Sequence, residues 1–81
     1  MYNFKVKGQN YEVRKSKEYD LKGDRMEKFC FQIFKDNIPL EKYKGYMDID
    51  DYFDAIGQDQ QPDKEMGMAL EYDLKRDLGI E

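Results

Sequence analysis

The densest group of side chains that could do chemistry is a run of aspartates near the middle of the chain. Four of them fall within seven residues, at Asp48, Asp50, Asp51 and Asp54. Closely spaced carboxylates can hold Ca²⁺, but a calcium-binding loop also needs an oxygen ligand at its fifth place and glycine at its sixth. Counted from Asp48, Tyr52 and Phe53 occupy those two places. The pattern therefore favours solvated carboxylates on a helix, and we expect no metal site.

Thiol and imidazole chemistry is limited because the chain has one cysteine, Cys30, and no histidine. These counts exclude zinc sites built from cysteine and histidine, and they exclude a Cys-His nucleophile pair. Since Cys30 lies between two phenylalanines, we expect a buried structural thiol rather than a reactive one.

The common motifs of catalysis and phosphate binding are missing from the sequence. These include Gly-x-Gly-x-x-Gly, Gly-x-x-x-x-Gly-Lys and Gly-x-Ser-x-Gly. Two carboxylates could act as the acid and base of a hydrolase. However, a chain of 81 residues has little room for a deep cleft that would raise the pKa of one of them. We therefore expect no enzymatic activity and no cofactor.

The charges of the chain are segregated rather than mixed. Residues 1–47 contain eleven Lys or Arg and seven Asp or Glu, a balance of +4. Residues 48–81 contain three basic and eleven acidic residues, a balance of −8. The net charge of −4 is thus a partial cancellation between a basic half and an acidic half.

The acidic half leads to our first functional hypothesis, a non-enzymatic protein whose acidic helical face binds a basic protein partner. Carboxylates spaced along a surface resemble a run of phosphates, and tyrosine is enriched in interfaces. By analogy alone, the sharpest form is a DNA-mimic inhibitor of a nucleic-acid enzyme, as carried by phages and mobile elements. The alternative is that acidic first turns only favour the helices and keep them soluble. The predicted binding residues are Asp50, Asp51, Asp54, Tyr52, Asp59, Asp63, Glu65 and Tyr72.

The basic half gives a second hypothesis, in which the sheet binds nucleic acid. A basic surface with aromatic side chains can bind single strands by stacking and phosphate contacts. The aromatic residues here are expected in the core, and the acidic net charge disfavours a nucleic-acid binder. Lysines also protect strand edges from aggregation. The residues of this alternative are Lys5, Lys7, Arg14 and Lys35.

Four strands must position the basic residues. Apolar and polar residues alternate over 2–7 and again at Tyr11 and Val13, which predicts a β-hairpin of residues 2–7 and 11–19 around the turn Gly8-Gln9-Asn10. Residues 14–18 are all polar, so the second strand either extends beyond the core or ends early. A turn at Lys22-Gly23-Asp24 leads to a third strand at 29–34, and Asp36-Asn37 predicts a tight turn into a fourth. Pro39 cannot donate a ladder hydrogen bond, so the fourth strand should lie at an edge.

Two helices should carry the acidic residues. The first has Asp48 as its cap and ends at Gly57, and the second begins near Pro62 and ends before Gly79. Gly67 lies on the apolar side of the second helix, where it either allows close approach to the sheet or indicates that the helix starts later. The expected buried stripes are Ile49, Phe53 and Ile56 in the first helix and Leu70, Leu74 and Leu78 in the second.

These elements predict one α+β domain over residues 1–81, a four-stranded antiparallel meander (ββββ) followed by two short helices packed on one sheet face. Met68 and Tyr72 lie one helical turn apart, away from the leucine stripe. They would either pack beneath the loop at 57–62 or form a homodimer seam. The lack of disulfide-forming cysteines and of a long apolar segment predicts a cytoplasmic protein with no membrane association.

Overall fold

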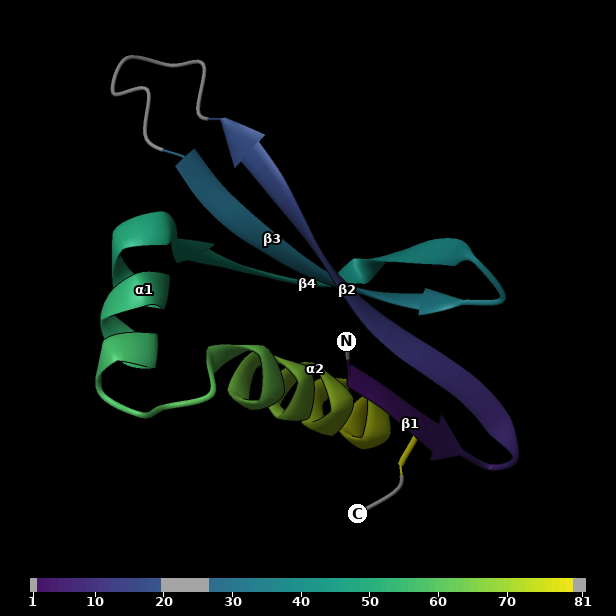
Figure 1. Ribbon diagram of the computed structural model, residues 1–81. Helices are drawn as coiled ribbons and strands as arrows, with labels where there is room; N and C mark the ends of the chain where they lie inside the picture. The colour runs from purple at the N-terminus through teal and green to yellow at the C-terminus, as the bar shows by residue number, and fades with distance from the viewer. Residues whose placement is uncertain (1, 20–26, 80–81) are drawn as a thin grey trace.

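Four antiparallel strands and two helices make up the computed structural model, which describes residues 2–19 and 27–79 (Figure 1). The strands follow the order β1-β2-β3-β4 in the sheet, and both helices pack on it, so the predicted α+β meander is confirmed. The predicted turn at Lys22-Gly23-Asp24 lies outside the described residues. The elements are β1 (Tyr2–Val6), β2 (Gln9–Tyr19), β3 (Glu27–Lys35), β4 (Ile38–Asp48), α1 (Ile49–Gly57) and α2 (Pro62–Asp77).

Two-residue turns set the register of the hairpins β1–β2 and β3–β4. Lys7 and Gly8 have φ angles of 49° and 78°, and Asp36 and Asn37 have 52° and 65°. Two successive left-handed residues are typical of the hairpin turns whose twist matches that of the strands. The first turn is tighter than predicted, because Val6 already pairs with Gln9.

The polar run at 14–18 continues β2 rather than ending it, and it pairs along its length with β3. β4 lies at the edge of the sheet, as Pro39 predicted. An irregularity in the pairing of β3 with β4 falls between Gln32 and Phe34. Such bulges bend an edge strand and make it a poorer template for pairing with another chain.

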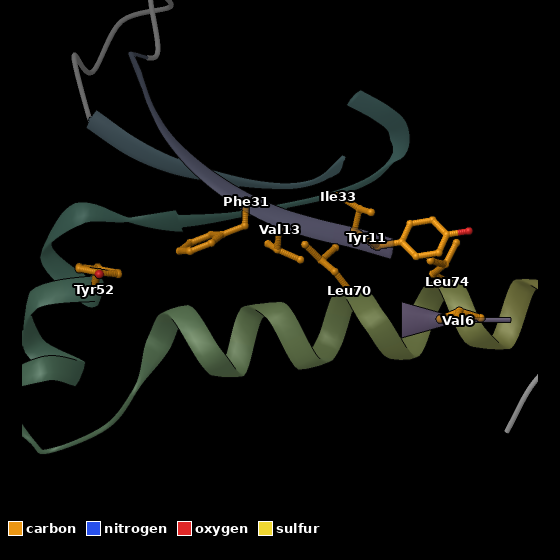
Figure 2. Packing of buried hydrophobic residues seen from close by; sticks show 8 residues of the cluster. All are labelled: Val6, Tyr11, Val13, Phe31, Ile33, Tyr52, Leu70 and Leu74. Atoms are coloured by element: carbon orange, nitrogen blue, oxygen red, sulfur yellow. The ribbon is translucent and has the colours of Figure 1, made fainter. Parts of the chain in front are cut away.

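The core lies between one sheet face and the helices, and Phe31 and Ile33 at its centre are almost completely buried. Gly67 of α2 faces this core, and a β-carbon there would collide with the ring of Tyr2. The predicted close approach between helix and sheet at Gly67 is therefore confirmed. Figure 2 shows the buried cluster of Val6, Tyr11, Val13, Phe31, Ile33, Tyr52, Leu70 and Leu74.

α1 buries a different side from the one predicted. Tyr52 is only 6% exposed, whereas Phe53 and Ile56 are 58% and 45% exposed. The Tyr52 ring packs edge-on against Phe29, with 4.7 Å between the ring centroids. The predicted stripe through Phe53 and Ile56 is thus wrong. Tyr52 can pack its ring on the sheet and also hydrogen-bond its hydroxyl to charged side chains, which Phe53 cannot do. Asp48 does occupy the cap position, but its side chain makes no capping hydrogen bond.

α2 follows its predicted stripe for most of its length. Leu70 and Leu74 are buried, but Leu78 is 43% exposed because it lies past the last residue of the helix. Gly79 adopts a left-handed φ of 76° just beyond it, as expected of a residue that ends a helix. Met68 and Tyr72 are exposed, so the prediction that they pack beneath the loop is wrong.

Candidate functional site

The carboxylates of α2 are largely neutralised by neighbouring groups of the chain. Asp77 lies 3.0 Å from Lys42 of β4 and accepts a hydrogen bond of 2.9 Å from Tyr43. These partners hold the pKa of Asp77 below its usual value. Other pairs join Glu71 with Lys75 and Asp73 with Arg76. The acidic surface predicted for the helical half therefore does not extend evenly over α2.

The carboxylates of α1 differ from those of α2. Asp50, Asp51 and Asp54 are exposed, and within the described ranges none of them forms an ion pair. Asp59 in the following loop and Glu65 in the first turn of α2 share this exposure and lack of an ion pair. The negative charge that remains available to a partner is thus concentrated on α1, the loop after it and the first turn of α2.

Exposed apolar side chains lie among these aspartates. Phe53 follows Asp50 by three residues and precedes Ile56 by three, so the three side chains are neighbours on the helix surface. Figure 1 shows α1 at one end of the molecule, while α2 runs along the sheet. We define the α1 patch as the exposed side chains Asp50, Asp51, Phe53, Asp54 and Ile56.

Tyr52 connects α1 with β2 and α2 instead of facing solvent. Its hydroxyl accepts a hydrogen bond of 2.6 Å from Lys15 Nζ and donates one of 2.9 Å to Asp63 Oδ2. Lys15 Nζ also lies 3.4 Å from Asp63 Oδ1 and 4.2 Å from the centroid of the Tyr52 ring. Burial alone would lower the pKa of Lys15, but its bond to Tyr52 and the charge of Asp63 outweigh that effect and raise the pKa.

This Lys15–Tyr52–Asp63 cluster changes the interpretation of two predicted binding residues. The expectation that Tyr52 projects from the acidic face is wrong, because its ring is buried and its hydroxyl is engaged. Asp63 remains half exposed but already has a cationic partner. Tyr72, in contrast, is 65% exposed, although it lies on the outer side of α2 rather than on α1.

A hollow of about 350 Å³ opens beside the α1 patch. Ile56 forms part of its wall together with Tyr2, Tyr52 and the loop residues Gln60 and Gln61. Pro62, Asp63 and Lys64 complete the wall, which is therefore partly aromatic, partly amide and partly charged. A side chain of a bound partner could enter this hollow next to the carboxylates.

The four basic residues of the nucleic-acid hypothesis do not share one face. Lys5 and Arg14 line a shallow depression on the helix-free side of the sheet, where Arg14 stacks over Phe34 at 4.3 Å and pairs with Glu12. Strand alternation places Lys35 on the opposite side, 5.9 Å from the Tyr11 ring. Lys7 occupies the first hairpin turn. The expected common basic face is therefore wrong.

Cys30 is 2% exposed, which confirms the expected buried thiol. Among residues 2–19 and 27–79, no three Cys, Asp or Glu side chains are grouped to hold a metal ion. Neither α1 nor α2, the helices of those described ranges, has the length and apolar character needed to cross a membrane. Comparisons of the chain with protein-family models, with curated proteins and with solved structures find no match.

Proposed function

We propose that this chain is a non-enzymatic interaction protein whose α1 patch binds a basic surface on a protein partner. The observation that supports this proposal is the contrast between the helices. Four of the five carboxylates of α2 have cationic partners, all except Glu65, whereas Asp50, Asp51 and Asp54 have none within the described residues. Solubility alone does not explain why Phe53 and Ile56 are exposed beside these aspartates.

Each part of the α1 patch has a different role in binding. The aspartates attract a basic partner over a distance and favour the correct orientation, which mainly raises the association rate. Phe53 and Ile56 supply apolar surface that is removed from water when the complex forms. The adjacent hollow receives a partner side chain. A partner that binds nucleic acid offers the matching basic groove, and in that complex the aspartates occupy the places of phosphates.

The test uses the full chain, a triple variant and a matched control. The triple variant D50N/D51N/D54N removes three negative charges from α1. The control D36N/E41Q/D73N makes the same change in net charge at exposed or half-exposed positions on other elements. Each protein is immobilised and exposed to a lysate of the native cells, and proteins retained by the wild type and the control but not by the triple variant are identified.

The affinity of each identified protein is then measured in purified form at several salt concentrations. We expect the triple variant to bind about tenfold more weakly or worse, and wild-type binding to weaken steeply as salt rises. Equal retention by the triple variant, or binding that salt does not change, would contradict the proposal. Retention of DNA or RNA at low salt that is lost in K5A/R14A would instead support the alternative hypothesis of nucleic-acid binding.

A further inference from the structure

The outer face of α2 carries a regular stripe that neither the core nor the α1 patch uses. Glu65, Ala69, Tyr72 and Arg76 recur at spacings of four, three and four residues, and all four are exposed. This spacing places side chains on one line along a helix and is the spacing of seams between paired helices. Met68 lies beside the line and is 52% exposed. We call these four residues the α2 seam.

The α2 seam is complementary to itself when two copies of the helix run antiparallel. If Glu65 of one copy faces Arg76 of the other, then Ala69 faces Tyr72. A two-fold axis repeats both contacts, as an isologous interface requires. Acid thus faces base, and a small side chain faces a large one, which lets the helices approach closely. A parallel arrangement would instead place Glu65 against Glu65 and Arg76 against Arg76.

We propose that a second copy of this chain docks on the α2 seam, forming an antiparallel two-fold dimer. The proposal goes beyond the proposed function, because no residue of the α1 patch belongs to the α2 seam. Tyr72 is 65% exposed, so most of the residue is available to the second copy. Met68 on the flank adds further apolar area.

Charges around Arg76 are compatible with this contact. Arg76 lies 3.5 Å from Asp73 and 4.0 Å from Asp77 of its own chain, yet its side chain stays 61% exposed. A guanidinium group has five N–H donors, so donors remain for Glu65 of the other copy. The guanidinium carbon of Arg76 also lies 5.9 Å from the centroid of the Tyr72 ring, which holds both side chains along the same line.

The dimer should be weak, because one pair of helices buries less than the roughly 1,600 Å² of a standard stable interface. Sedimentation equilibrium of the full chain over a wide concentration range is the suitable measurement. The weight-average mass should rise from the monomer value of 9.8 kDa as the concentration rises. A mass that stays at the monomer value up to about 1 mM, which means a dissociation constant well above 1 mM, would overturn the proposal.

Charge reversal tests the register. E65R and R76E each place like charges against each other twice per dimer, so each should weaken dimerisation about tenfold or more, or 1.4 kcal/mol. The double variant E65R/R76E restores opposite charges and should regain wild-type dimerisation. Glu65 and Arg76 lie eleven residues apart, about 16 Å along the helix, so the rescue can only arise between copies.

E41R serves as the matched control, since it makes the same charge change as E65R on exposed β4. It should leave dimerisation unchanged, and circular dichroism should show that every variant keeps its fold. A double variant that dimerises as weakly as the single variants would overturn the antiparallel register. Unchanged dimerisation in E65R would overturn the α2 seam as the interface.

Discussion

At the scale of single residues, the hydroxyl of Tyr52 has the most consequential position. It is the shared partner of Lys15 and Asp63, and so it joins one strand and two helices through a single oxygen. We expect Tyr52→Phe to lower the free energy of unfolding by about 1–2 kcal/mol, because the ring stays packed while two bonds to charged groups are lost. Urea unfolding measures this difference.

Tyr72→Phe is the control for that experiment. Tyr72 is exposed, so loss of its hydroxyl should change the free energy of unfolding by less than about 0.5 kcal/mol. Equal effects of the two substitutions would mean that the Lys15–Tyr52–Asp63 cluster adds nothing to stability.

Tyr2 is the residue whose titration should be visible in the stability of the protein. Its hydroxyl donates a hydrogen bond to Glu71, and this bond, together with burial and the charge of Glu71, raises the pKa of Tyr2 to about 12. Because the pKa is higher in the folded than in the unfolded state, the protonated hydroxyl stabilises the folded protein. This contribution is complete at pH values below about 10, the pKa of tyrosine in the unfolded chain. That contribution is lost as the pH rises from 10 through 12.

Tyr2→Phe should therefore destabilise the protein near neutral pH, and the gap between wild type and variant should narrow between pH 10 and pH 12. Denaturant unfolding of both proteins at matched pH values measures the gap, and lysines that titrate in the same range cancel in the comparison. A gap that is constant up to pH 12 would contradict the assigned pKa.

At the scale of elements, the packing of α2 on β1 depends on the absence of a side chain at Gly67. Gly67→Ala should raise helix propensity by about 1 kcal/mol. We nevertheless expect net destabilisation, because the new methyl group would overlap the Tyr2 ring and push this ring of β1 away from α2. Gly57→Ala at the end of α1 is the matched control, since its methyl group would meet nothing within 4 Å. Thermal unfolding that shows Gly67→Ala to be the more stable variant would contradict this packing.

The elements also show what the sequence could and could not predict. The sheet was predictable because alternation, the Asp36-Asn37 turn and Pro39 all act locally. The buried side of α1 was not predictable. In a helix of nine residues, two apolar stripes that start at Ile49 fit the helical spacing about equally well, one through Phe53 and one through Tyr52. The choice depends on Lys15, which lies 37 positions from Tyr52 in the chain.

The same limit applies to the candidate site. Composition predicted an acidic helical half, and Asp50, Asp51 and Asp54 are indeed exposed on α1. It could not show that Lys42 of β4 reaches Asp77, because that pair forms only after the sheet and α2 have packed together. Long-range pairing thus reduced a broad acidic surface to α1, the loop after it and the first turn of α2.

At the scale of the whole molecule, the two oppositely charged halves do little to hold each other. Two ion pairs of the described residues, Lys15–Asp63 and Lys42–Asp77, join the sheet to the helices, and each has one largely exposed partner. Exposed pairs contribute at most about 1 kcal/mol each and are screened by salt. The hydrophobic core, which salt does not weaken, must therefore supply most of the stability.

We accordingly expect stability and partner binding to respond differently to salt. Raising NaCl from low to high concentration should change the free energy of unfolding by less than about 1 kcal/mol, because the ion pairs between the sheet and the helices are few and partly solvated. Binding through the α1 patch should weaken severalfold over the same range, since its unpaired aspartates act on the partner through solvent. Urea unfolding and binding measured in the same buffers separate the two effects. A loss of binding that runs parallel to a loss of stability would show that salt unfolds the protein rather than screening the α1 patch.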